Sequence, residues 1–260
     1  MTVRSDKAGT SRHSWPRRRR GIKQQHLCAG IAKVCRKLVN VIMIPRVFSN
    51  WPIVMFNVGL IILGLNRNSV GKARIRGGPT FYLRHKDLTD YGSLIEIYGR
   101  HVYGSPLMSP DGAVVIDIGA SIGDFALSIC RTGKPRILIF EPQQQALDLL
   151  VQNIERNGFG HLVTLFPIPV GSCVGLNEIF EANDITRCEL IKCDCEGDEY
   201  TIFNETSPEI LRRIQRISME CHDNGQRHAL ERLHAPGSGR NQFGMVRWND
   251  EQPVSHFRQH

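Results

Sequence analysis

Beyond residue 110, short continuous runs of hydrophobic residues alternate with segments in which hydrophobic residues have helical spacing. Short apolar runs such as positions 113–118 (AVVIDI) are typical of strands buried on both faces of a parallel sheet. Helical spacing of apolar residues separates these runs at positions 122–131 and 143–156. This alternation predicts a doubly wound, mostly parallel α/β sheet, whose strands have their carboxyl ends at one ligand-binding edge. The predicted strands are 113–118, 136–140, 162–168, 189–193 and 214–219.

The residues before this sheet predict an extension made of helices and a hairpin. Positions 73–84 alternate around a Gly-Gly-Pro turn, which indicates a β-hairpin, and positions 88–98 have helical spacing. Positions 50–65 form an apolar stretch of about 15 residues, whereas a spanning helix needs roughly 20. We expect a buried or interfacial helix there, with a membrane anchor as the alternative.

Charge is distributed very unevenly along the 260 residues. The formal net charge is +8, yet positions 1–40 alone hold 11 of the 33 Lys and Arg residues, against one acid. The remaining chain has 22 basic and 24 acidic residues and is therefore slightly acidic. The net charge of the whole chain thus gives no reason to expect a nucleic-acid partner. The expected units are a basic disordered head (1–40), the extension (41–110), a catalytic domain (111–250) and a polar tail (251–260).

Eight cysteines lack CxxC spacing, and no apolar signal segment follows the run of arginines at 17–20. We therefore expect free thiols in a cytoplasmic protein, with peripheral membrane contact through the N-terminal region left open. Cys193 and Cys195 lie two positions apart in a predicted strand and should face the same side. Burial as small apolar side chains is favoured there over a zinc site.

The segment VVIDIGASIGDF (114–125) is the sharpest chemical motif. A buried strand leads through Asp117 into a turn with Gly119 and Gly123 before a helix begins, an arrangement that suits a ligand at the helix N-terminus. Glu141 ends the next strand, where an acid can accept hydrogen bonds from ribose hydroxyls. An acid before the turn disfavours a pyrophosphate and suits a sulfonium, which points to S-adenosyl-L-methionine rather than a nicotinamide cofactor. The predicted cofactor-binding residues are Asp117, Gly119, Ala120, Ser121, Gly123, Glu141 and Pro142.

Together with FEP, NIERNG and LIKCDCEGDEY, this segment resembles the FkbM-type methyltransferases over about positions 72–223. The resemblance implies an α/β fold of the class I methyltransferase (Rossmann-like) type and S-adenosyl-L-methionine as the methyl donor. It also implies transfer to an acceptor hydroxyl, on a sugar, a glycan or a natural product.

Charged residues at the ends of the fourth and fifth strands are the candidates for the acceptor side. Methyl transfer needs an in-line acceptor oxygen and a base for its proton. The residues do not decide between Asp194, Glu196, Glu220 and His222 as the base, although His222 has the most suitable intrinsic pKa. We expect no metal, while the carboxylates leave a divalent cation as an alternative. The predicted catalytic residues are Lys192, Asp194, Glu196, Glu220 and His222.

Two regions are shorter than in the family that the chain resembles. Only positions 172–175 separate the third strand's loop from the LNEIFEAND segment, and only 40 residues follow Glu220. A helix is expected at 226–234 and one more strand at 243–248. The shortening leaves a second hypothesis open, in which the chain is a catalytically impaired relative that acts as a binding or membrane-associated protein.

Overall fold

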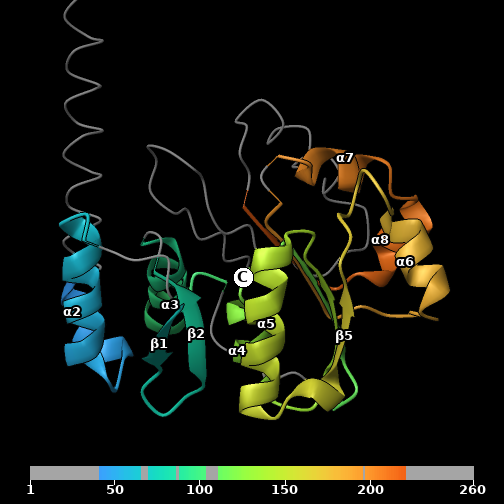
Figure 1. Ribbon diagram of the computed structural model, residues 1–260. Coiled ribbons are helices and arrows are strands. Elements are labelled where there is room, and N and C mark those ends of the chain that lie inside the picture. The colour runs from blue at the N-terminus through green and yellow to red at the C-terminus, as the bar shows by residue number, and fades with distance from the viewer. Residues whose placement is uncertain (1–40, 66–69, 86–87, 104–110, 196, 221–260) are drawn as a thin grey trace, which may run out of the picture.

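The computed structural model describes residues 41–65, 70–85, 88–103, 111–195 and 197–220 (Figure 1). The helix and the strand expected after residue 225 lie outside these residues, as do the head and the tail. The elements are α2 (Trp51–Ile62), β1 (Val70–Arg74), β2 (Thr80–Arg84), α3 (Thr89–Arg100), β3 (Val114–Ile118), α4 (Asp124–Cys130), β4 (Arg136–Phe140), α5 (Gln144–Asn157), β5 (Val163–Phe166), α6 (Leu176–Ala182), β6 (Leu190–Cys193), α7 (Glu199–Asn204), α8 (Pro208–Arg213) and β7 (Ile217–Met219).

The central sheet has five parallel strands in the order β5-β4-β3-β6-β7. The chain therefore moves outward from β3 in one direction and then returns to continue on the other side, which is the doubly wound arrangement. The predicted parallel α/β sheet is confirmed. The strand predicted at 214–219 is shorter, because Ile214 forms only an isolated bridge with Cys188 before β7 begins at Ile217.

The two faces of the sheet bury separate hydrophobic clusters. Along β3, Val115 belongs to one cluster and Ile116 to the other, as the twofold alternation of a strand requires. The first cluster includes α3, α4, α5 and the β1-β2 hairpin, and the second includes α6, α7 and α8 (Figure 1). Phe81 of β2 and Leu94 of α3 are fully buried in the first cluster. The extension and the sheet thus share one core.

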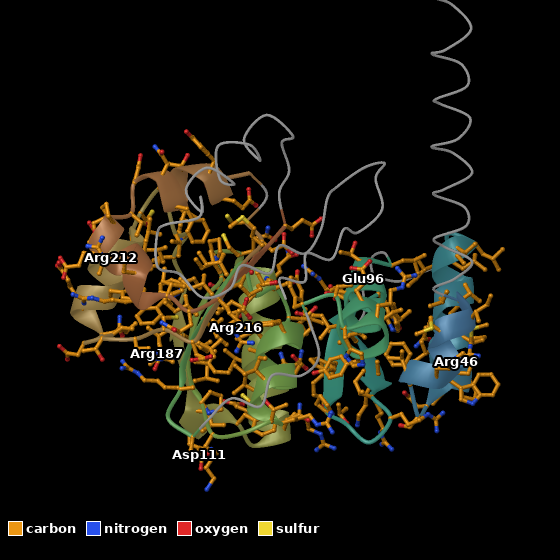
Figure 2. The ribbon with its side chains drawn as sticks, turned by 180° about the vertical axis from the view of Figure 1, so that it is seen from behind. Arg46, Glu96, Asp111, Arg187, Arg212 and Arg216 are labelled. Carbon is orange, nitrogen blue, oxygen red and sulfur yellow. The ribbon has the colours of Figure 1, made fainter. Side chains whose placement is uncertain are left out.

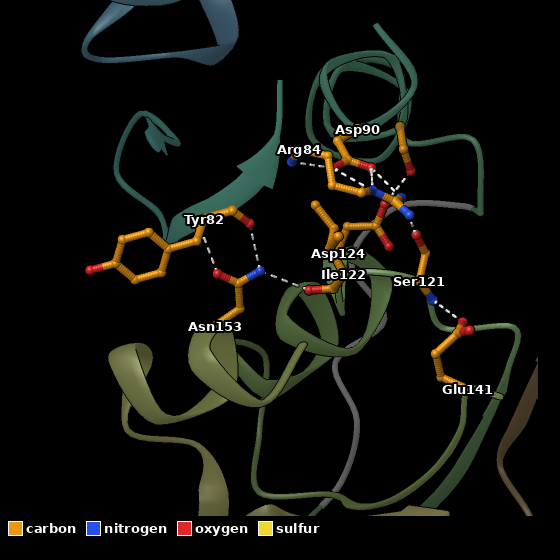
Figure 3. Close-up of polar contacts among 9 residues, drawn as sticks. Tyr82, Arg84, Asp90, Ser121, Ile122, Asp124, Glu141 and Asn153 are labelled. Atoms are coloured by element: carbon orange, nitrogen blue, oxygen red, sulfur yellow. Dashed lines mark hydrogen bonds and ion pairs between the residues drawn. The ribbon is translucent and has the colours of Figure 1, made fainter. Parts of the chain in front are cut away.

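Two asparagines of α5, Asn153 and Asn157, bond the hairpin to this helix, and Figure 3 shows Asn153. The side chain of Asn153 accepts a hydrogen bond from the backbone N–H of Tyr82 (2.6 Å) and donates to the carbonyls of Tyr82 (3.0 Å) and Ile122 (2.9 Å). One turn later, Asn157 makes the same pair of bonds to the backbone of Thr80, at 3.0 and 2.8 Å. The two amides thereby satisfy the edge of β2 as a neighbouring strand would.

Helix α2 lies at the outer end of the extension, away from the sheet (Figure 1). Val54 and Val58 are buried against the hairpin, while Ile53 and Phe56 on the other side are exposed. Pro52 sits in the first turn, where its missing N–H costs no hydrogen bond. Among the helices that the structure describes, none is both long and apolar enough to cross a membrane.

Candidate functional site

The turn between β3 and α4 adopts left-handed backbone conformations at three positions. The φ angles are +72° at Gly119, +49° at Ser121 and +83° at Gly123. A Cβ atom at Gly119 would lie 1.9 Å from the carbonyl oxygen of Asp194, so this glycine lets the loop after β6 approach the turn closely. At Gly123 a Cβ would lie 3.3 Å from the side chain of Leu150, so this glycine lets the turn pack closely against α5.

Glu141 is held rigidly beside this turn (Figure 3). One of its carboxylate oxygens accepts the backbone N–H of Ser121 at 2.7 Å, and the other accepts that of Gln143 at 2.8 Å. A carboxylate has about four acceptor positions, so these two bonds orient the group and leave acceptor capacity for the hydroxyls of a ligand. Pro142 follows as an exposed residue, and Ala120 is buried within the turn.

Asp117 and Lys192 form a buried ion pair between neighbouring strands. They are register partners in β3 and β6, and the ammonium lies 3.3 Å from one carboxylate oxygen. Neither oxygen of Asp117 accepts a hydrogen bond from a described residue, whereas Lys192 donates to the carbonyls of Ile118 and Gly119. Both side chains are almost completely buried, so the structure places them beneath the glycine turn rather than on its surface.

Burial raises the pKa of Asp117 to about 6, although the nearby Lys192 opposes that rise. For Lys192, burial alone would lower the pKa, but the surrounding groups, with Asp117 foremost, raise it above its ordinary value. Asp124 and Asp194 also act on Lys192. The ammonium is therefore charged at neutral pH, and three acidic side chains, Asp117, Asp124 and Asp194, act on it.

Tyr103 completes this group and was missed by the sequence analysis. Its hydroxyl lies 3.4 Å from a carboxylate oxygen of Asp194, and its ring packs edge-on against Phe125. Burial and the carboxylates of Asp194, Asp124 and Glu220 raise its pKa well above 10, although Lys192 lowers it, so the hydroxyl stays protonated. Tyr103 has no motif around it and is 91 positions from Asp194, so no local signal in the sequence could have found it. We call Asp117, Asp124, Lys192, Asp194 and Tyr103 the charged corner.

Arg84, at the end of β2, is a second residue that the sequence analysis missed. It forms a two-pronged ion pair with Asp90 at the start of α3, with a shortest distance of 2.5 Å, and it donates to the hydroxyl of Ser121 at 3.2 Å. Ser121 in turn is bonded through its backbone to Glu141. A continuous polar chain thus runs from the extension through the glycine turn to the end of β4 (Figure 3).

The predicted catalytic residues are found in different settings. Asp194 and Lys192 lie together in the charged corner, and Glu220 is buried at the end of β7, with its backbone N–H bonded to the carbonyl of Cys193. Glu196 and His222 lie outside the described residues. Within the described part of the chain, no group of three or more His, Cys, Asp or Glu side chains could hold a metal ion.

The described cysteines are all free thiols, and three of them are buried. The sulfur atoms of Cys193 and Cys195 are 3.6 Å apart. The strand ends at Cys193, so Cys195 follows it rather than lying within it, yet both side chains face the same side. The hydrogen bond with Cys195, followed by desolvation, raises the pKa of Cys193 well above its ordinary value, which leaves an unreactive thiol.

No protein-family model matches this chain, and no curated protein matches it. Solved structures with partial similarity include the METTL16 MTase domain, at 14% identity and a TM-score of 0.45, over 60% of this chain. The match covers 64% of that domain, so this chain spans slightly less than two thirds of it. An rRNA methylase from Streptococcus thermophilus matches over 54% of this chain and 78% of its own, at 14% identity and a TM-score of 0.39. A tRNA methyltransferase from M. jannaschii matches over 58% and 43%, at 14% identity and a TM-score of 0.40.

The strand order, and not these similarities, defines the class. A five-stranded parallel sheet whose strand order reverses between β3 and β6, with a left-handed glycine turn after the central strand β3, is a doubly wound, Rossmann-like α/β fold. In such sheets a ligand binds beyond the carboxyl ends of the strands at the point of reversal. Gly119, Glu141 and Asp194 all lie at that edge.

Proposed function

We propose that this protein is an S-adenosyl-L-methionine-dependent methyltransferase. The observation that carries the proposal is the placement of Glu141, a carboxylate fixed by two backbone N–H groups beside a left-handed glycine turn. An acid at the end of the second strand of a doubly wound sheet is suited to the hydroxyls of a ribose. The carboxylates that surround a single ammonium in the charged corner suit a ligand that carries positive charge.

The fit to this cofactor can be argued residue by residue. Gly119, Ala120, Ser121 and Gly123 would line the side of the nucleoside, with Glu141 and Pro142 at the ribose. Asp117 has no exposed atoms, so it would act on the cofactor electrostatically and not by direct contact. Its effect would pass through Lys192, which donates a hydrogen bond to the carbonyl of Gly119. Bound there, the cofactor would supply a methyl group activated by its sulfonium.

On the acceptor side, the protein has to position a hydroxyl and receive its proton. Asp194, Glu196, Glu220 and His222 remain the candidates for the base. Tyr103 is protonated and so would act as a hydrogen-bond donor to the acceptor or to Asp194 rather than as a base. The carboxylates at this edge repel a polyanion, so a neutral hydroxyl of a sugar, a glycan or a natural product is the acceptor class we propose.

Binding of the cofactor tests the proposal directly. By isothermal titration calorimetry, the full-length protein should bind S-adenosyl-L-methionine and its demethylated product, S-adenosylhomocysteine. Glu141→Gln should weaken both about 10- to 100-fold, because hydrogen bonds to a charged acceptor contribute about 1.5–3 kcal/mol. Asp148→Asn removes an exposed carboxylate from α5, the helix that follows Glu141, and should leave both affinities unchanged.

Two results would contradict the proposal. One is the absence of binding by the folded wild-type protein at millimolar ligand. The other is equal affinity in wild type and Glu141→Gln, with circular dichroism showing both proteins folded. Binding without turnover on any hydroxyl acceptor would instead favour the second hypothesis, a relative that binds the cofactor and does not catalyse.

A further inference from the structure

The outer surface of α2 is an apolar face that the described residues leave uncovered. Ile53 and Phe56 are 58% and 66% exposed, and Leu63 just beyond the helix is 71% exposed. They follow one another at helical spacing, so they lie on the same side, opposite the buried Val54 and Val58. Further large apolar side chains are exposed in the same segment: Ile42, Trp51, Ile62 and Leu65.

The part of the sequence that contains this face carries charge of a single sign. Residues 41–65 and 70–76 contain Arg46, Lys72, Arg74 and Arg76 and no acid, and Figure 2 shows Arg46 beside α2. Over positions 1–76 the chain has 16 basic residues and one acid, whereas positions 77–260 have 17 basic and 24 acidic residues. The apolar face therefore belongs to the one strongly basic part of the chain.

From this combination we propose that the outer face of α2 binds the surface of an anionic lipid bilayer. The helix has 12 residues and is about 18 Å long at 1.5 Å per residue, too short for a hydrocarbon core of about 30 Å. It would lie in the plane of the interface, with Ile53 and Phe56 among the acyl chains. Stable attachment of this kind needs an apolar and an electrostatic contribution together, and this segment supplies both.

A second copy of the chain fits the same face less well. Pairing α2 with α2 would bring two basic segments together, and their like charges would oppose association. Anionic headgroups would instead neutralise them. Charge complementarity thus favours the lipid surface as the occupant.

Cosedimentation of the full-length protein with vesicles tests this proposal. The protein should sediment with vesicles of phosphatidylcholine and phosphatidylglycerol, much less with phosphatidylcholine alone, and less as the salt concentration rises. The double variant Ile53→Glu with Phe56→Glu should lose at least about tenfold in affinity, since two apolar side chains no longer enter the bilayer. Gln152→Glu, at an exposed position of α5, adds an acid elsewhere and should retain wild-type binding. Phe56→Ser provides a milder variant of the face without added charge and should bind more weakly than wild type.

Three results would overturn the proposal. These are no sedimentation with anionic vesicles, equal sedimentation with neutral ones, or wild-type binding by folded variants of the face. Light scattering without lipid tests whether a second copy of the chain occupies this face. A stable dimer that Ile53→Glu with Phe56→Glu dissociates would assign the face to a second copy instead.

Discussion

Replacing Lys192 by methionine would remove the one cation of the charged corner while keeping most of the side-chain volume. Asp117 would lose a partner at 3.3 Å, and the carbonyls of Ile118 and Gly119 would lose a donor. Both members of the pair are at least 96% buried, so water could not take the place of the ammonium. Removing one partner of a buried ion pair costs about 3–5 kcal/mol, and we expect a loss of that size in the free energy of unfolding at about pH 8.

The loss should depend on pH with a definite sign. Lys192 lowers the pKa of Asp117, so in the variant that pKa rises further above 6. A carboxyl whose folded pKa exceeds its ordinary value of 3.8 stabilises the folded state while it is protonated. That contribution is fully present below pH 3.8 and is lost as the pH rises through the folded pKa. The deficit of Lys192→Met relative to wild type should therefore be largest near pH 8 and smaller near pH 5.

Urea unfolding followed by circular dichroism at these two pH values measures the effect. Lys134→Met removes an exposed lysine and serves as the control, with an expected change within about 0.5 kcal/mol at either pH. Adding Asp117→Asn to Lys192→Met should recover much of the stability, because no buried charge then remains unpaired. A deficit below about 1 kcal/mol, or an equal deficit at both pH values, would refute the reasoning.

Three further predictions concern the support of the site and its chemistry. Asn153→Ala should lower the free energy of unfolding by about 3 kcal/mol, since three backbone groups lose a partner, and Asn157→Ala, in a more exposed position, by about 1 kcal/mol. Gly119→Ala should cost more than about 3 kcal/mol, because the added Cβ meets a backbone carbonyl at 1.9 Å, whereas Gly158→Ala, also left-handed but with open space, should cost about 1 kcal/mol. Equal losses in either pair, measured by urea unfolding, would contradict these assignments. His222→Ala should leave the affinity for S-adenosyl-L-methionine within about twofold by calorimetry and lower turnover, and equal losses of both would exclude a role for this histidine as the base.

Much of the sheet could be predicted because its strands are continuous apolar runs, such as the stretch around Ile116. Such runs are typical of strands that are buried on both faces of a parallel sheet. The glycine turn was also predictable from local sequence, because Gly119 and Gly123 directly follow the apolar strand. Register was not, because it depends on which strand lies beside β3. Lys192 was therefore expected to face the acceptor, whereas the structure pairs it with Asp117 beneath the turn. Tyr103 reaches Asp194 only through the tertiary fold, which no local pattern encodes.

The extension also behaves differently from a separate unit placed before a catalytic domain. Asn153 bonds to the hairpin at Tyr82 and to the glycine turn at Ile122 with one side chain, so we expect a shift of the hairpin to displace the turn as well. Arg84 makes a second connection, through Ser121, to the residue that is bonded to Glu141. With a shared hydrophobic core and two polar connections, residues 70–85 and 88–100 support the proposed ribose site. Changes in the hairpin should consequently alter cofactor affinity, even though no hairpin side chain belongs to the predicted cofactor-binding set.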